Sequence, residues 1–163
     1  MSSERAFLIA PVETILFAEP TVASRQIADS DARDVSQLML DAYGTSLGIE
    51  LTLDTAQAEV LSLLAGNTGV PRRDAWLGIW EVYGPPTSAI LCTTWRGMPY
   101  IAHVMTAPAA RERGYASSLV REAAQVFAAS GETHIGAMVD EGSEAMPLFI
   151  ELGFTRMFTP AGL

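Results

Sequence analysis

The chain has 163 residues, 49% of them hydrophobic, which suits one compact domain with a sizeable core. Its formal net charge of −9 and isoelectric point near 4.6 argue against nucleic-acid or anionic-membrane partners, since both select a basic surface. A single cysteine, Cys92, excludes an internal disulfide and suits a reducing cytoplasm. We therefore expect one soluble, cytoplasmic domain over residues 1–163.

The N-terminal residues 1–20 are expected to form an extension to this domain. Residues 7–18 are apolar, but Pro11 and Glu13 interrupt them, which favours an added strand or hairpin over a signal segment. No apolar run is long enough to cross a bilayer, so no membrane partner is expected. The extension is expected to cover an open sheet edge, and a homodimer through that edge stays an open alternative.

A strand and two helices are predicted next. Residues 21–28 alternate as a strand does, and residues 29–31 then offer side chains that cap a helix ending at Gly44. A second helix is expected over residues 54–66, from a cap at its first residue to a terminating glycine. Residues 44–50 form the loop between the two helices.

From residue 76 the hydrophobic period changes from that of helices to that of strands. Strands are predicted over residues 76–83 and 88–95, separated by the Gly-Pro-Pro turn at 84–86. A turn at residues 96–99 leads into a third strand over residues 100–106. The three strands form an antiparallel meander.

The last third of the chain predicts a crossover. A helix with a clear apolar stripe begins at Gly114, and a short strand over residues 133–139 follows it. That strand is expected to lie parallel to residues 100–106, with the helix as the connection. A helix over residues 143–152 and a strand over residues 154–158 complete the order.

Residues 104–119 are predicted to form the end of a strand, a loop that contains arginines, and the start of a helix. Unpaired N–H groups and the positive end of the helix dipole favour an anion there, and Arg111 and Arg113 supply guanidinium donors. Gly114 and Ala116 keep the backbone accessible to a diphosphate. The segment predicts a phosphate site, although a plain loop with a solvated arginine pair stays open.

Two sequence blocks in the chain resemble the GCN5-related N-acetyltransferase (GNAT) family. The first, Arg111-x-x-Gly114-x-Ala116, fits the pattern [RQ]-x-x-G-x-[GA], and the second, residues 148–154, is similar to L-Y-x-x-x-G-F. The expected order β-α-α-β-β-β-α-β-α-β also resembles that family. The resemblance implies an α/β (α+β) fold with a mixed, mostly antiparallel central sheet, flanking helices, and a splay between the fourth and fifth core strands.

By this resemblance, the chain is an acetyl-CoA-dependent N-acetyltransferase that uses no metal. It would move an acetyl group by direct attack to a primary amine of an unidentified small-molecule or peptide acceptor. The main chain of the fourth core strand would bind the pantetheine arm, and the loop before the crossover helix would bind the pyrophosphate. The residues implied in cofactor binding are Val104, Met105, Thr106, Arg111, Glu112, Arg113, Gly114, Tyr115, Ala116, Ser117 and Phe149.

The general base has three candidates, because an alkyl ammonium of pKa about 10.4 must lose a proton before it attacks. Strand alternation places Tyr100 on the acceptor face and His103 on the opposite face. His103 is therefore either a base displaced by a bulge or a core histidine, and Tyr100 is either a relay or an interior aromatic. Glu81, on the neighbouring strand, is the third candidate.

Two departures from the family pattern point to weakened catalysis. Phe149 stands where the family commonly has a tyrosine that protonates the leaving thiolate, and Gly142 stands where it often has an asparagine. Releasing a thiolate of pKa about 8.5 unprotonated forfeits about 2 kcal/mol. The alternative function is thus a catalytically weak or inactive CoA-binding regulatory or interaction module. A purely structural domain would require the arginine loop to be a coincidence.

Overall fold

The computed structural model describes residues 5–44 and 51–157. Its helices are α1 (Val12–Ile15), α2 (Ala32–Tyr43), α3 (Leu53–Leu64), α4 (Tyr115–Ala129) and α5 (Ala145–Glu151). Its strands are β1 (Arg5–Pro11), β2 (Arg25–Gln26), β3 (Val70–Pro71), β4 (Leu77–Ile79), β5 (Ser88–Trp95), β6 (Met98–Thr106), β7 (His134–Asp140) and β8 (Thr155–Arg156). Short 3-10 turns lie at Asp29–Asp31, Arg73–Ala75 and Pro108–Ala110.

All described strands belong to one mixed sheet in the order β2-β4-β5-β6-β7-β1-β8, and β3 pairs with β5. Of the described strand pairs, β6–β7 is parallel and the others are antiparallel. The parallel pair is joined through α4, as expected for a crossover connection. The mixed, mostly antiparallel sheet predicted from sequence is confirmed.

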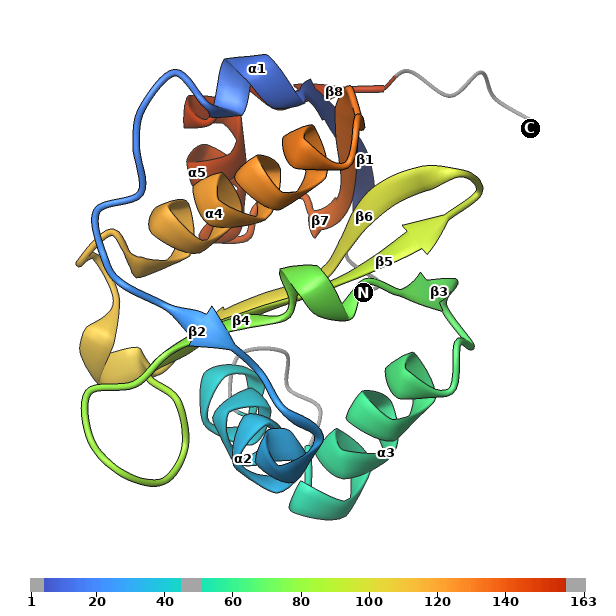
Figure 1. The fold of residues 1–163 in the computed structure, drawn as a ribbon. Coiled ribbons are helices and arrows are strands. Elements are labelled where there is room, and N and C mark those ends of the chain that lie inside the picture. Colours follow the sequence, from blue (N-terminus) through green and yellow to red (C-terminus); the bar gives the residue numbers. More distant parts are fainter. Residues whose placement is uncertain (1–4, 45–50, 158–163) are drawn as a thin grey trace.

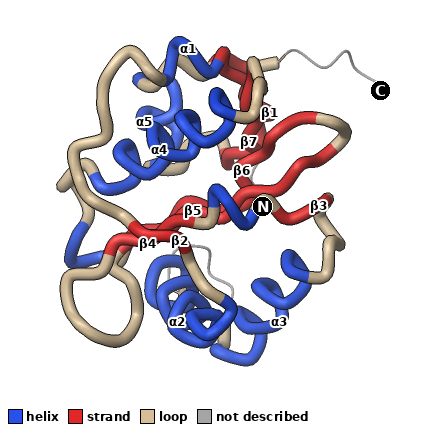
Figure 2. The backbone as a smooth tube through the Cα atoms, in the orientation of Figure 1, coloured by secondary structure: helices blue, strands red, loops and turns tan. Residues whose placement is uncertain are grey.

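Helices cover both faces of the sheet. Helices α1, α4 and α5 lie on one face, and α2 and α3 lie on the other (Figures 1 and 2). Each face has its own apolar cluster: one includes Phe127 and Phe154, and the other includes Trp76, Leu38 and Leu63. The sheet is thus buried on both sides, which fixes the direction in which each strand residue points.

The sheet is splayed between β6 and β7. Among the described residues these strands pair only at 100–101 and 136–137, although β6 runs on to Thr106 and β7 to Asp140. Their close approach depends on Gly136, because a Cβ there would lie 2.8 Å from the Met98 Cε and 2.9 Å from the Phe7 Cζ. Beyond this short contact the two strands diverge, as the resemblance implied.

The N-terminal segment forms a strand but no hairpin. β1 pairs with β7 along all seven of its residues and carries β8 on its other edge. The chain then turns into α1, where the Val12 N–H donates to the Thr133 carbonyl at 2.8 Å. Of the two expected forms, strand or hairpin, the described residues form the strand, and residues 12–15 pack as a helical turn against α4 rather than extending the sheet.

Two predicted strands are much shorter in the structure than in the sequence prediction. The strand expected over 21–28 is reduced to β2, and the one expected over 76–83 is reduced to β4. The side chain of Ser118 on α4 accepts the Thr21 and Val22 N–H groups at 3.1 and 3.0 Å, so the first half of the former segment is bound to a helix. Side-chain contacts to helices thus replace strand pairing.

Two local boundaries also differ from the prediction. Thr52, rather than Asp54, caps α3, and its Oγ1 accepts the Thr55 N–H at 3.2 Å. The β5–β6 turn contains only Arg96 and Gly97, with φ of 52° and 78°, so β6 starts at Met98. Most of the loop predicted over 44–50 lies outside the described residues.

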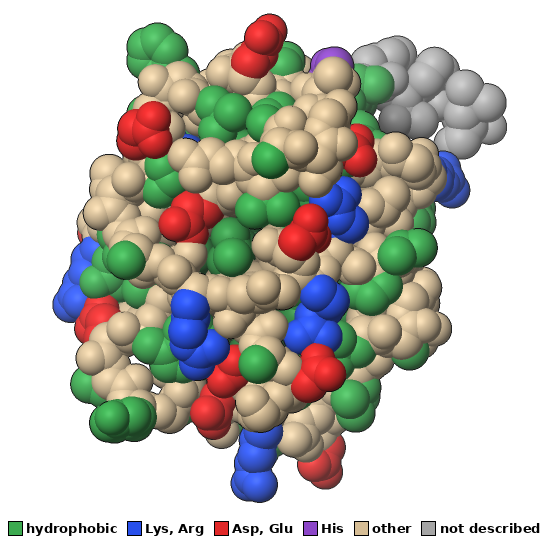
Figure 3. All heavy atoms as spheres, in the orientation of Figure 1, with side chains coloured by type: hydrophobic (Ala, Val, Ile, Leu, Met, Phe, Trp, Pro, Cys, Tyr) green, Lys and Arg blue, Asp and Glu red, His purple; other side chains and the backbone are tan. Residues whose placement is uncertain are grey.

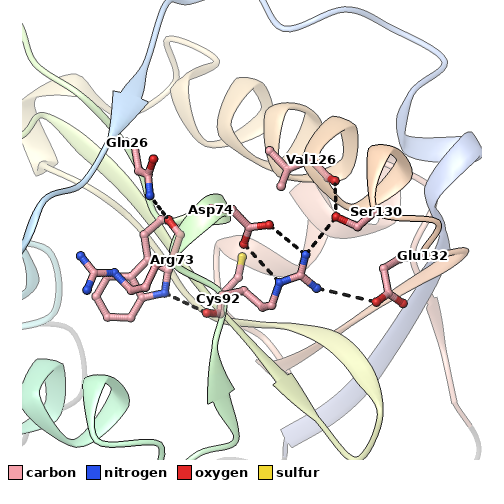
Figure 4. Close-up of polar contacts among 9 residues, drawn as sticks. Gln26, Arg73, Asp74, Cys92, Val126, Ser130 and Glu132 are labelled. Carbon is pink, nitrogen blue, oxygen red and sulfur yellow. Dashed lines mark hydrogen bonds and ion pairs between the residues drawn. The ribbon is translucent and has the colours of Figure 1, made fainter.

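Arg72 ties the middle of the chain to the end of α4. Its guanidinium donates to Asp74 at 3.1 and 3.0 Å and to the Ser130 Oγ at 3.3 Å, and lies 3.7 Å from Glu132. Figure 4 shows these three acceptors converging on one guanidinium group. The same group lies 4.8 Å from the centre of the Phe127 ring. The cluster joins β3 and the following turn to the helix that leads into β7.

On the face seen in Figure 3, basic and acidic side chains are interspersed, with no basic patch of the kind that nucleic acid selects. None of the helices in residues 5–44 and 51–157 combines the length and apolar character needed to span a membrane.

Candidate functional site

The edge of β6 that faces the splay carries backbone groups with no partner strand among the described residues. The Ala107 N–H donates to the Thr87 carbonyl at 2.9 Å, on the side of β5. Because backbone groups alternate along an antiparallel strand, Val104 and Thr106 direct theirs to the opposite edge, from which β7 has diverged. Met105 instead turns its carbonyl to β5, where the Ser88 Oγ donates to it at 2.7 Å. Two of the three predicted pantetheine-binding residues thus face the opening.

The anion site predicted from the sequence would lie at the start of α4. Gly114 is its N-cap with φ of 78°, and the first helical hydrogen bond runs from the Ser118 N–H to the Gly114 carbonyl at 3.0 Å. The N–H groups of residues 114–117 therefore have no intrahelical acceptor. An added Cβ at Gly114 would meet nothing within 4 Å, so the position borders open space. The left-handed backbone, rather than crowding, explains the glycine.

The two predicted arginines have different partners within the protein. Arg113 Nη1 donates to the Glu81 Oε1 at 3.3 Å, and the Tyr115 hydroxyl donates to the same oxygen at 2.6 Å. Arg111 Nη2 donates to the Ala42 carbonyl at 2.9 Å, at the negative end of the α2 dipole. Arg111 therefore anchors the C-terminal turn of α2, while Arg113 lies beside the start of α4.

Glu81 does not occupy the position predicted for it. It follows the end of β4 instead of lying within a strand, and its carboxylate is held at the start of α4 by Arg113 and Tyr115. The prediction of Glu81 on the neighbouring strand is wrong, because β4 ends at Ile79. In this position Glu81 lies beside the start of α4, where the anion site is predicted, and not on a strand next to β6.

A β-bulge in β6 changes the predicted direction of His103. The register pairs Tyr100 with Thr93 and His103 with Leu91, so three steps along β6 oppose two along β5. Leu91 belongs to the apolar cluster under α2 and α3, and Thr93 shares its face. Tyr100 and His103 therefore lie on the same face. The prediction that alternation separates them is wrong, because the bulge inserts one residue between them.

His103 is hydrogen-bonded on both ring nitrogens. Its Nε2 lies 3.1 Å from the Glu59 Oε1 on α3, and its Nδ1 lies 3.4 Å from the Tyr43 hydroxyl on α2. The same hydroxyl lies 3.4 Å from the Val104 carbonyl, at the open edge of β6. A carboxylate, an imidazole and a phenol thus form a chain that ends where the splay begins.

The protonation of this chain follows from its contacts. The hydrogen bond from His103 lowers the pKa of Glu59 below its ordinary value, which keeps the carboxylate charged. Burial raises the pKa of Tyr43, so its hydroxyl stays protonated at neutral pH. Burial likewise raises the pKa of Tyr100, whose ring lies 5.5 Å from that of Trp95.

Glu59 and Tyr43 were not found from sequence. In the sequence alone, Tyr43 is the last residue of an apolar helix stripe, and Glu59 is a charged residue expected on the outer face of the second helix. Neither belongs to a motif, and only the tertiary fold brings them to His103.

Phe149 lies in the apolar core rather than on an open surface. Its side chain is 3% exposed and packs edge-to-face against Phe154, with ring centres 5.0 Å apart. Gly142 has φ of 79° in the turn between β7 and α5, a conformation that favours glycine. In residues 5–44 and 51–157 there is no group of three or more His, Cys, Asp or Glu placed to hold a metal ion.

Comparisons with known proteins agree with this geometry. The family model for FR47-like proteins matches residues 87–160, which include β5, β6, the start of α4 and α5. A search of curated proteins found no significant match.

Several solved structures share the fold. A GCN5-related N-acetyltransferase from Sphaerobacter thermophilus superposes with a TM-score of 0.70 and 17% identity, over 94% of this chain and 48% of that one. A GNAT-family acetyltransferase from Colwellia psychrerythraea superposes with a TM-score of 0.71 and 12% identity, over 95% of this chain and 53% of that one. A GNAT-family protein from Desulfovibrio desulfuricans superposes with a TM-score of 0.64 and 17% identity, over 85% of this chain and 87% of that one. The chain thus spans about half the length of the first two structures.

The splayed mixed sheet, with an open β6 edge beside the start of α4, defines a GNAT fold. The resemblance to the GCN5-related N-acetyltransferase family predicted from sequence is confirmed by the FR47-like match and by these structures.

Proposed function

We propose that this protein is an acetyl-CoA-dependent N-acetyltransferase that transfers an acetyl group directly to a primary amine. The FR47-like match and the GNAT-fold structures support acetyl transfer at the level of the family. The use of acetyl-CoA, the amine acceptor and the direct attack are more specific than this family-level support. They rest on the site described above.

One observation carries the proposal: the open edge of β6 and the start of α4 lie at the same end of the splay. Val104 and Thr106 present backbone donors and acceptors to an amide-bearing arm, a form of recognition that does not depend on side-chain identity. Residues 114–117 present N–H groups at the positive end of a 15-residue helix, with Arg113 beside them. A ligand with amides at one end and a diphosphate at the other matches this arrangement.

The reaction forms a C–N bond as the thioester C–S bond breaks, and one proton must leave the amine nitrogen. We infer that His103 takes that proton, because the bulge in β6 turns its side chain to the same face as Tyr100. No acid is placed at Phe149, so the thiolate leaves unprotonated and takes a proton from water. A slow but complete reaction is expected.

Activity is tested by incubating the purified protein with acetyl-CoA and a panel of amines. The panel should contain amino acids, polyamines, aminoglycosides and peptides with free N-termini or lysines. Amine-dependent thiol release, with a mass gain of one acetyl group on the amine, is the expected result. Failure to bind acetyl-CoA would overturn the proposal.

A second candidate is a CoA-binding regulatory or interaction module. The burial of Phe149 against Phe154 favours it, since this position offers no proton to a leaving thiolate. Binding of CoA and acetyl-CoA with similar affinity, together with no thiol release across the whole panel, would establish this candidate instead.

A further inference from the structure

We propose that Tyr43, His103 and Glu59 act as a proton relay, in which Tyr43 and His103 take the amine proton and Glu59 is a positioning residue. The inference rests on the proposed function. It adds two residues, from α2 and α3, that neither the sequence motifs nor the comparisons assign.

The order of the relay follows from the distances. The Tyr43 hydroxyl is 3.4 Å from the Val104 carbonyl and 3.4 Å from the His103 Nδ1, so it lies between the open edge of β6 and the imidazole. The His103 Nε2 is 3.1 Å from Glu59. Such contacts are often long without substrate and tighten when it binds. The hydroxyl is therefore the group nearest the opening, and the carboxylate is the farthest from it.

Each proton in the relay has a defined origin and destination. As the amine attacks, its proton passes to the Tyr43 oxygen while the Tyr43 proton moves to the His103 Nδ1. The Nε2–H of the resulting imidazolium donates to Glu59, whose negative charge stabilises the cation. The imidazolium then returns its proton to water, and the released thiolate takes one from water. Tyr43 ends each cycle neutral, and the sum is one amide and one thiol.

Glu59 fixes the tautomer that the relay needs. A carboxylate accepts hydrogen bonds and donates none, so Nε2 carries the hydrogen and Nδ1 does not. The Tyr43 hydroxyl donates to the Val104 carbonyl in the structure, and the relay requires its O–H to turn to Nδ1, which lies at the same distance. His134, by comparison, lies exposed at the start of β7 with only the Thr133 hydroxyl on its Nδ1. The chain therefore offers a matched histidine that lacks a carboxylate partner among its described contacts.

Two further charged groups among the described residues bear on the relay. Burial, followed by the charges of Asp140 on β7 and Glu59, raises the pKa of Tyr43, which keeps the hydroxyl neutral. Arg111 binds the carbonyl of Ala42, the residue before Tyr43, and thereby holds the last turn of α2 in place.

The test compares kcat and the KM for acetyl-CoA for wild type, Glu59→Gln and Tyr43→Phe with the best amine from the panel. Loss of the carboxylate charge removes the group that stabilises the imidazolium formed during transfer, so Glu59→Gln should lower kcat about tenfold and leave the KM for acetyl-CoA unchanged. Tyr43→Phe should lower kcat by about a hundredfold with little change in the affinity for acetyl-CoA. Asp54→Asn on α3 and Tyr83→Phe on the exposed β4–β5 loop are the controls.

The outcomes separate this inference from the proposed function. Amine acetylation with Glu59→Gln and Tyr43→Phe kcat values equal to those of their controls would overturn the relay and leave the acetyltransferase intact. Binding of acetyl-CoA without transfer to any amine would overturn both. A lower kcat in both Glu59→Gln and Tyr43→Phe, with normal acetyl-CoA binding heats and normal unfolding midpoints, would support the relay, because a purely structural contact would not lower kcat while binding and stability stay unchanged.

Discussion

The Tyr115 hydroxyl donates a 2.6 Å hydrogen bond to the Glu81 Oε1, the same oxygen that Arg113 contacts at 3.3 Å. A carboxylate thus lies beside the N–H groups at the start of α4, the place proposed for a diphosphate. Glu81 and the ligand would compete for one guanidinium. The contact is exposed, so its strength is that of a surface ion pair.

We therefore predict that Glu81→Gln tightens CoA binding about two- to fivefold at low salt, because a repelling charge is removed and Arg113 is released. Calorimetry at two salt concentrations measures the gain, which should shrink at the higher one. Glu151→Gln, an exposed position on α5, is the matched control. Weaker binding by Glu81→Gln would instead mean that Glu81 supports the site.

Arg72→Met should destabilise the fold by about 1–3 kcal/mol, since it removes a largely buried cation and leaves Asp74, Glu132 and Ser130 without it. The side chain of Arg72 is only 17% exposed, which separates it from the surface arginines. Urea unfolding gives the free energy directly. Arg33→Met on the exposed face of α2 is the control, and equal losses for the two variants would contradict this role.

The Asp31→Asn variant should be less stable than wild type at neutral pH and equally stable in acid. The hydrogen bond from Arg25 lowers the pKa of Asp31, and the Ala28 N–H donates to it at 2.8 Å. A carboxyl with a lowered folded-state pKa stabilises above its unfolded pKa, and that contribution disappears as pH falls through the folded pKa. An asparagine Oδ1 can still accept the Ala28 N–H, so the variant removes the charge and keeps that hydrogen bond.

The expected difference for Asp31→Asn is about 0.5–1 kcal/mol at pH 7, the size of a partly exposed ion pair. It should vanish near pH 2, where wild type is protonated as well. Unfolding curves at the two pH values measure it, with Asp41→Asn on α2 as the control. A difference that persists in acid would assign the loss to the hydrogen bond rather than to the charge.

Helices and their connections were the more predictable part of the fold. Gly114 and the apolar stripe that follows it predicted the helix α4 as a crossover connection. Because such a connection joins parallel strands, β7 was expected to run parallel to β6, as it does. These predictions use local periods and handedness, which the sequence carries by itself. The splay came from the family resemblance and could not be derived from the hydrophobic pattern.

The candidate site depends partly on neighbouring residues, which the sequence shows directly, and partly on strand register, which it does not show. Gly114 and Arg113 are close in sequence, so their motif was visible. The bulge that turns His103 toward α2 and α3 exists only in the pairing of β6 with β5, and alternation counted along one strand cannot detect it. Glu59 and Tyr43 reach His103 from two separate helices, and no spacing rule connects them.

Calorimetric titration of acetyl-CoA into wild type, Gly114→Glu and Gly97→Glu tests the central claim most directly. Both glycines have φ of 78° and no atom within 4 Å of an added Cβ, so the two variants carry the same backbone strain and the same charge. Gly97 lies in the β5–β6 turn, whereas Gly114 begins α4. We predict binding by wild type and Gly97→Glu and its loss in Gly114→Glu. No heat in wild type, or equal heats in the two variants, would contradict a cofactor site at the start of α4.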